Sequence, residues 1–152
     1  MLPPPEELKT AIEQLLPGVS LTLEGGALIA APHDVTAVCR CLKEHERFSL
    51  DYLANLTAVD YPPDRIEVVS HLYSMVKKHG PVTLKVRLPR AKPVVASVTS
   101  LWRGAEFQER EVYDLFGVTF EGHPDLRRIL MWDGFEGYPM RKDYVVEDQD
   151  AL

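Results

Sequence analysis

The stretch that decides the fold is EREVYDLFGV, residues 109–118, followed closely by FEGHPDLRRILMWDG, residues 120–134. At about 100° per residue, positions 101–116 form a helix with one apolar stripe. The stripe consists of Leu101, Trp102, Ala105, Val112, Leu115 and Phe116. Glu109 lies inside it, where an ionised carboxylate is costly unless a cation or several donors meet it. We therefore predict that Glu109 is buried and pairs with Arg127 or Arg128, so that Glu109→Gln destabilises the protein far more than Glu111→Gln.

Local patterns upstream of this stretch predict two further helices and several strands. A helix is expected after the prolines at 3–5, with Leu8, Ile12, Leu15 and Leu16 inside, and it ends at Pro17-Gly18. The other expected elements are a hairpin turning at 24–26, a helix over 34–45, strands over 56–59, 66–76 and 82–88, and a helix over 99–116 ending at Gly117. This order predicts an α+β fold with a mixed, mostly antiparallel sheet flanked by helices.

Residues 119–152 differ from the predicted globular domain, residues 1–118, because they have no sustained period of 2 or 3.6. Their aromatic side chains are Phe120, Trp132, Phe135, Tyr138 and Tyr144. Disordered tails are poor in aromatics, and these rings need cover. We predict that this segment, the C-terminal arm, is extended and docks on a partner protein. From the residues alone, the alternative that it wraps its own domain stays equally open.

Composition excludes several classes of protein. The 152 residues are 45% hydrophobic, enough for one core of ordinary size. The formal charge of −6 and a pI near 5.3 argue against a nucleic-acid partner. No apolar run is long enough to span a bilayer, and the first residues do not resemble a signal peptide, so we expect a soluble, non-secreted protein without direct membrane insertion. Cys39 and Cys41 diverge on a helix and are expected to be reduced thiols.

No arrangement typical of an active site is visible. There is no phosphate-binding glycine loop, and the histidines are scattered. His123 could relay protons, but a hydrogen-bonding structural role is favoured. Glu109 and Glu111 point about 200° apart on a helix and cannot act together. Glu106, Arg110 and Asp114 are expected to form a solvated ladder of ion pairs. Phe107 on the same face is a candidate contact for the arm or for another protein.

Several short motifs in this region are also the basis of a resemblance to a known family. Glu-Arg-Glu at 109–111, Tyr113-Asp114 and Phe116-Gly117 are followed in register by Gly-His-Pro-Asp-Leu-Arg-Arg at 122–128. Together they resemble the signature of the C subunit of bacterial NADH-quinone oxidoreductase, respiratory complex I, whose mitochondrial-type relative is the 30 kDa subunit. The expected signature and interface residues are Glu109, Arg110, Glu111, Tyr113, Asp114, Phe116, Gly117, Gly122, His123, Pro124, Arg127 and Arg128. Glu106-Phe107, where Asn-Trp is expected, and Val145, where proline is common, depart from the family pattern.

The resemblance implies a non-catalytic, peripheral-arm subunit that braces the large subunit shaping the quinone site. FMN and the Fe-S clusters would be held by partner subunits, and this chain would hold no cofactor or metal. Its expected location is the cytoplasmic side of the bacterial inner membrane, reached through other complex I subunits. Three alternatives stay open: the equivalent subunit of a membrane-bound hydrogenase or ferredoxin-linked complex, a free-standing enzyme using Glu109 or His123, and a generic adaptor.

Overall fold

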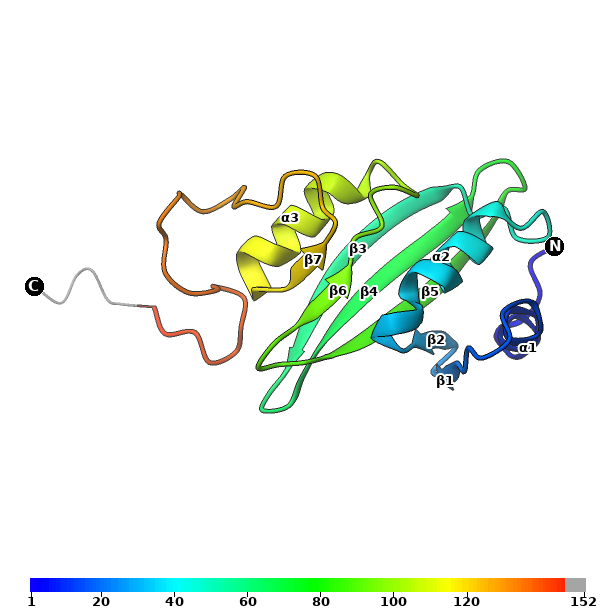
Figure 1. Cartoon of the computed structure of the whole chain (residues 1–152), viewed down its shortest axis with the longest axis horizontal. Coiled ribbons are helices and arrows are strands. Elements are labelled where there is room, and N and C mark those ends of the chain that lie inside the picture. Colours follow the sequence, from blue (N-terminus) through cyan, green and yellow to red (C-terminus); the bar gives the residue numbers. More distant parts are fainter. Residues whose placement is uncertain (147–152) are drawn as a thin grey trace, which may run out of the picture.

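A five-stranded sheet, covered by helices on one face, organises the fold (Figure 1). The structure is a computed structural model that describes residues 1–146, so the last six positions of the predicted arm lie outside the described residues. The elements are α1 (Pro5–Leu15), β1 (Thr22–Glu24), β2 (Ala27–Ala30), the 3-10 turn η1 (Pro32–Asp34), α2 (Val35–Glu44), β3 (Tyr52–Tyr61), β4 (Arg65–Ser74), β5 (His79–Pro89), β6 (Val94–Ala96), α3 (Ala105–Phe116) and β7 (Thr119–Glu121).

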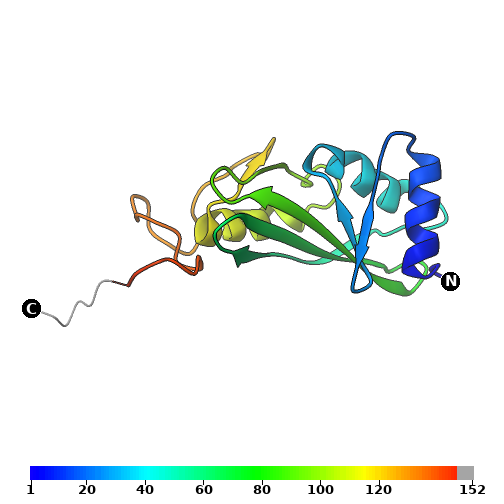
Figure 2. The same cartoon turned by 90° about the horizontal axis from the view of Figure 1, so that it is seen from below.

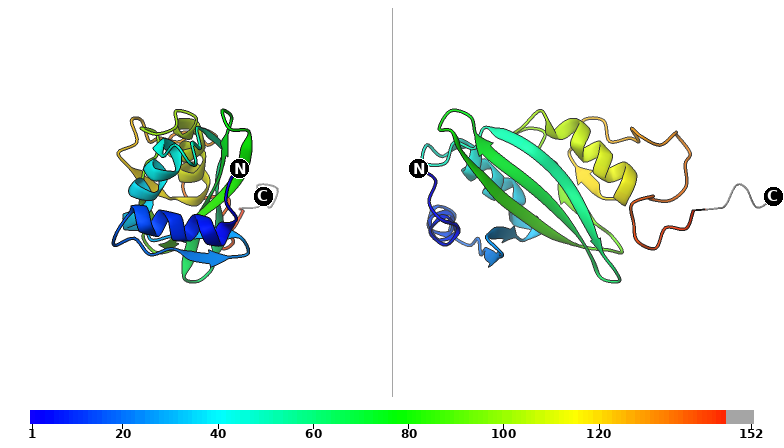
Figure 3. Two further views of the ribbon diagram at one scale, coloured as in Figure 1. Left: turned by 90° about the vertical axis from the view of Figure 1, so that its right-hand side faces the viewer. Right: turned by 180° about the vertical axis from the view of Figure 1, so that it is seen from behind.

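The order of the sheet is β1-β2-β5-β4-β3. Strands β2 and β5 run parallel, and the other neighbours in this sheet are antiparallel. The predicted α+β fold with a mixed, mostly antiparallel sheet is thus confirmed. Seen from behind, β3, β4 and β5 lie in front of the helices, so the helices pack on the opposite face (Figure 3).

Alternation along β5 places the core on the helical side of the sheet. Val82, Leu84, Val86 and Leu88 are buried as predicted, and the residues between them are half-buried. In α2, the predicted inner residues Val35, Val38, Cys39 and Leu42 are all buried against this face. The predicted hairpin is also present, because Gly25 and Gly26 adopt positive φ angles of 57° and 82° between β1 and β2.

Two helices differ from the prediction. In α1 the buried residues are Leu8, Ala11 and Ile12, whereas Leu15 is 43% exposed. Helix α3 begins at Ala105 rather than near residue 99, because residues 98–104 form turns. Trp102 is nevertheless buried, and its indole N–H donates to the Leu50 carbonyl at 3.0 Å. The end of α3 is as predicted, with Gly117 in the left-handed region at φ 79°.

The strands differ mainly in length and number. β3 has ten residues where a four-residue strand was expected. Strands β6 and β7 form a separate two-stranded parallel sheet that the sequence did not indicate, and Phe120 in β7 is buried. The first three residues of the arm therefore pair with the globular part. Figure 2 shows α1 at one end of the molecule and the rest of the arm extending past α3 at the other.

Candidate functional site

Asp114, near the end of α3, is the centre of the contacts between α3 and the arm. Its side chain is fully buried and accepts hydrogen bonds from the Arg128 guanidinium at 2.8 Å. It also accepts the backbone N–H groups of Ile129, Leu130 and Met131 at 3.1, 2.7 and 2.9 Å. The predicted solvated ladder of ion pairs through this residue is therefore wrong, because Asp114 faces the arm and not solvent.

Four donors keep this carboxylate ionised. Burial alone would raise the pKa of Asp114, but the N–H of Met131, the Arg128 guanidinium and the other two amides together hold it below its usual range. A carboxylate that accepts several backbone N–H groups fixes the main chain of the segment that donates them. Asp114 thus sets the path of residues 129–131.

Arg110 of α3 and Arg128 of the arm both donate to backbone carbonyls where the helix and the arm meet. Arg110 is buried and donates to the carbonyls of Arg127 and Arg128 at 3.1 and 3.0 Å. Arg128 donates to the carbonyls of Asp114 and Gly137 at 3.0 and 2.9 Å. Two arginines and one aspartate at this end of α3 therefore all fasten the arm to the helix.

Glu109 is fully buried, as predicted, but its predicted arginine partner is wrong. Its carboxylate accepts the Ser97 hydroxyl at 2.6 Å and the Val98 N–H at 2.8 Å. Burial raises the pKa of Glu109, although these two hydrogen bonds act in the opposite direction. Arg127 pairs with Asp125 on the surface, and Arg128 pairs with Asp114. The reason is helical geometry: five residues along α3 separate Glu109 from Asp114 by about 140°.

His123 uses both ring nitrogens inside the fold. Its Nε2 lies 2.9 Å from the Glu106 carbonyl, and its Nδ1 accepts the N–H of Asp125 at 3.0 Å. Since a carbonyl can only accept, Nε2 carries the proton in this arrangement. Nε2 also lies 4.0 Å from Glu109, and neither side chain is exposed. The geometry is that of a structural histidine that holds the turn before Pro124 on α3.

The arm has two anchors, which are the places where it is attached to its own domain: the end of α3, described above, and the end of β3. The sequence did not predict the second anchor. Arg90 donates to buried Asp60 at 2.7 and 3.0 Å and to Asp143 of the arm at 2.8 Å. The N–H of Lys142 donates to Asp60 at 2.9 Å. Arg90 holds the pKa of Asp60 below its usual range. The available signal was the same as for Glu109: Asp60 continues the inward-facing alternation of Leu56 and Ala58.

Gly117 allows the arm to approach the end of α3 closely. A Cβ atom at this position would lie 2.6 Å from the ring of Tyr138. That ring packs between the guanidinium groups of Arg128 and Arg141, whose centres are 5.3 and 5.1 Å from the ring centroid. Arg141 also donates to the Phe116 carbonyl at 2.7 Å. Gly117 therefore serves both the helix end and the fit of the arm.

The arm exposes several apolar side chains. Leu130 and Trp132 are 57% and 68% exposed, and Met140 is also exposed. Trp132 packs edge-on against Phe135 at 4.7 Å between ring centroids, which stiffens this surface. On α3, Phe107 is exposed and lies 5.9 Å from the Arg110 guanidinium. The arm is thus held to its own domain by polar contacts and also exposes apolar side chains to solvent.

The family model for "Respiratory-chain NADH dehydrogenase, 30 Kd subunit" matches residues 28–150, which include both anchors. The chain belongs to this family. The C 2 subunit of the NADH-quinone oxidoreductase of Rhizobium meliloti (strain 1021) is 48% identical over 120 residues, covering 78% of this chain and 65% of that protein. The C subunit of the Moorella thermoacetica enzyme is 48% identical over 124 residues, covering 81% and 82%.

Two solved structures resemble this 30 kDa family member. A chain of the membrane-bound sulfane sulfur reductase, an archaeal respiratory membrane complex, has a TM-score of 0.73 at 26% identity and covers 97% of this chain and 98% of its own length. The trypsin-resistant fragment (1-134) of Nqo5 has a TM-score of 0.59 at 30% identity and covers 80% of this chain and 98% of its own.

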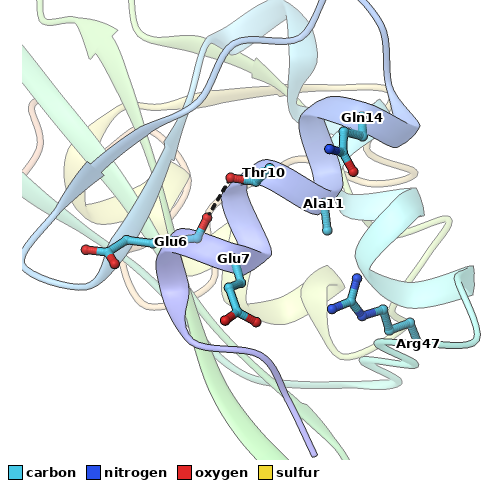
Figure 4. A pocket seen from close by; sticks show the side chains of 6 residues that line it. All are labelled: Glu6, Glu7, Thr10, Ala11, Gln14 and Arg47. Atoms are coloured by element: carbon cyan, nitrogen blue, oxygen red, sulfur yellow. Dashed lines mark hydrogen bonds between the residues drawn. The ribbon is translucent and has the colours of Figure 1, made fainter.

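Several hollows lie on the surface of this 30 kDa-type subunit. The one drawn in Figure 4 lies between α1 and Arg47, and its hydroxyl, that of Thr10, donates to the Glu6 carbonyl at 3.0 Å. A nucleophile paired with a base is not among its lining residues. Within residues 1–146, no group of three or more His, Cys, Asp or Glu side chains is placed to hold a metal ion. The described helices include none with the length and apolarity of a membrane span.

Proposed function

We propose that this chain is a non-catalytic peripheral subunit of a proton-translocating NADH-quinone oxidoreductase. It braces the large subunit that shapes the quinone site while the complex passes electrons from NADH through FMN and Fe-S clusters to quinone. Those cofactors are held by partner subunits, and the chain reaches the cytoplasmic side of the bacterial inner membrane through them. The chain spans less than two thirds of the length of two of the curated relatives it matches, 65% and 60%, so the activity of the whole assembly is part of the proposal.

The single observation that carries the proposal is the two-sided arm. Asp114, Arg110 and Arg128 fix its inner side, so the outer side is ordered before any partner arrives. Leu130 and Trp132, which the arm exposes, are the kind of aromatic and apolar side chains that form the centres of protein interfaces. An arm ordered in advance loses less conformational entropy on docking.

The bracing role follows from this rigidity. A quinone site must keep its geometry to a fraction of an ångström, which requires support from outside the residues that line it. An arm held at both α3 and the end of β3 is a stiff support, because Asp60, Arg90 and Asp143 fix it a second time.

The alternative is the equivalent subunit of a membrane-bound hydrogenase or a ferredoxin-linked complex. The similarity to a chain of the sulfane sulfur reductase complex favours keeping it, since that protein belongs to a respiratory membrane complex of a different kind. A free-standing enzyme has no support in the geometry, because Glu109 and His123 are both buried and hydrogen-bonded within the fold.

The test is co-purification of the subunit with its complex, followed by native mass spectrometry. The double variant Leu130→Asp/Trp132→Asp is expected to fold with an unchanged Tm and to be lost from the complex. Met75→Asp is the matched control, because Met75 is an exposed apolar residue at the turn between β4 and β5. Equal incorporation of both variants would overturn docking through the arm, and the identity of the neighbouring subunits would decide between the two kinds of complex.

A further inference from the structure

β3 is an edge strand whose cover comes from α3 and the arm rather than from its own side chains. It has ten residues and pairs only with β4, whereas the strand at the other edge, β1, has three residues. Natural proteins protect long edges with lysine, proline, a bulge or a covering element. The β3 sequence YLANLTAVDY contains no lysine, arginine or proline, and its register irregularity lies between Leu53 and Asn55. Residues 55–61 are therefore a regular edge without protective side chains, and its cover is α3 and the arm.

The backbone groups on this edge face α3. The N–H of Leu56 donates to the side-chain carbonyl of Gln108 at 2.6 Å. Leu56 therefore directs its backbone away from β4, and because direction alternates along a strand, Ala58 does the same. The Gln108 amide occupies the place that the carbonyl of a neighbouring strand would take.

A groove runs between this edge and α3, and its lining suits an extended peptide. The strand contributes Asn55, Leu56, Thr57 and Ala58, the helix contributes Gln108, Glu111, Val112, Leu115 and Phe116, and the arm contributes Met140. Glu111 is the one charged side chain among these lining residues. Its exposed carboxylate is complementary to a basic residue on whatever lies in the groove.

We propose that residues 55–58 of β3 accept an extended segment of a neighbouring subunit as a sixth strand, with a basic residue of that segment opposite Glu111. The inference rests on the proposed function, since the segment belongs to a subunit of the same complex. Main-chain hydrogen bonds to Leu56 and Ala58 supply affinity, and side chains that alternate along the segment contact the apolar wall of α3. Gln108 releases Leu56 when the segment enters.

Two observations favour a partner subunit over a second copy of this chain. Pairing two β3 edges would bring a second α3 and a second Glu111 to the same groove, opposing like charges. Met140 of the arm also lines the groove, so the groove adjoins the segment proposed to dock on the partner. The arm and the β3 edge thus lie within reach of the same neighbouring subunit.

Amide hydrogen exchange of the isolated chain and of the purified complex, resolved to single residues, tests the proposal. In the isolated chain the Ala58 amide is expected to exchange rapidly, and in the complex at least tenfold more slowly. Gln108→Ala removes the internal acceptor for Leu56. In the isolated variant the Leu56 amide should exchange faster than in the wild type, whereas in the complex it should stay protected.

Several outcomes would overturn the proposal. One is an Ala58 exchange rate that is the same in the free and assembled protein. Another is a Leu56 amide that Gln108→Ala deprotects equally in both states. A photo-crosslinker at position 55 should react with alternate residues of one partner segment, and crosslinks to a second copy of this chain would also contradict it. Loss of the chain from the complex would instead mean that the proposed function itself fails.

Discussion

At the scale of single residues, Asp114 joins α3 to the arm through four donors, and its replacement tests that anchor. Asp114→Asn keeps the shape but removes the charge that Arg128 neutralises inside the fold. Breaking a buried pair typically costs about 3–5 kcal/mol, and we expect a loss of free energy of unfolding in that range. Denaturant titration of both proteins measures it.

The control for this prediction is Asp125→Asn, which removes the same group from an exposed pair with Arg127. An exposed pair is worth about 0–1 kcal/mol, so this variant should unfold almost like the wild type. Equal losses of unfolding free energy in the two variants would show that the buried contacts of Asp114 stabilise the protein no more than a surface ion pair does. Since the pKa of Asp114 is lowered on folding, its contribution is present above about pH 4 and is lost as the pH falls below that value.

For Glu109 we predict that stability depends on pH in the opposite direction. Its pKa is raised by burial, so its ionisation opposes folding, and the stability associated with it falls as the pH rises above about 4.3. A glutamine at position 109 can accept the Val98 N–H and donate to the Ser97 hydroxyl. Glu109→Gln should therefore cost less stability than it would if Glu109 were paired with an arginine, as the sequence predicted. As the pH rises above about 4.3, the variant should therefore gain stability relative to the wild type.

Denaturant titrations at several pH values check this prediction. Glu111→Gln is the matched control, because it removes a carboxylate from the exposed side of the same helix. A difference between Glu109→Gln and the wild type that does not change with pH would contradict the buried, desolvated carboxylate. Cys39 and His123, which interact electrostatically with Glu109, are present in all the variants, so the comparison isolates the carboxylate.

At the scale of elements, the end of α3 gives a prediction based on one missing Cβ atom. Gly117 and Gly122 both have positive φ, 79° and 83°, so alanine at either position costs about 1–2 kcal/mol in backbone strain. Only at Gly117 would the added Cβ meet Tyr138. Gly117→Ala should therefore cost about 1 kcal/mol more than Gly122→Ala, the scale of forcing a side chain off its rotamer.

Thermal unfolding of the two variants and of Gly117→Ala/Tyr138→Ala measures this difference. Removal of the Tyr138 ring should eliminate the extra cost, since nothing else then blocks the Cβ atom. If Gly117→Ala and Gly122→Ala unfold alike, the approach of the arm to α3 is looser than the structure shows.

Elements with a local period could be predicted from the sequence, and those that depend on distant contacts could not. The inner face of α2, the Gly25-Gly26 hairpin and the alternation of β5 each follow from a few adjacent residues. β6 and β7 have three residues each and pair across 25 positions, so neither has a pattern of its own. Likewise, the position of Glu109 in the apolar stripe predicted its burial, whereas its donors come from a turn whose path the sequence does not specify.

At the scale of the whole molecule, the chain is proposed to support a neighbouring subunit and to hold none of the cofactors of the reaction. Its absorption spectrum tests this proposal. We expect the isolated protein to be colourless and not to oxidise NADH, because the described residues offer no cluster of metal ligands and the sequence has no phosphate-binding loop. Absorption spectra and an NADH oxidation assay on the purified chain measure both properties. A flavin or iron–sulfur band that survives purification would contradict the proposed division of labour.

The arm itself gives the last prediction, which distinguishes a segment that only wraps its own domain from one that docks. Its backbone is fixed at α3 and β3, but Arg127 and Lys142 are exposed within it. Trypsin should therefore cut the free protein within residues 127–146 and cut the assembled complex there at least tenfold more slowly. Mass spectrometry of timed digests locates the cuts. Asp114→Asn should accelerate cleavage of the free chain, because three arm amides lose the full charge of their acceptor, whereas Asp125→Asn should not. Equal protection in the free and assembled states would mean that the contacts with its own domain are sufficient, and that exposed Leu130 and Trp132 do not mark an interface.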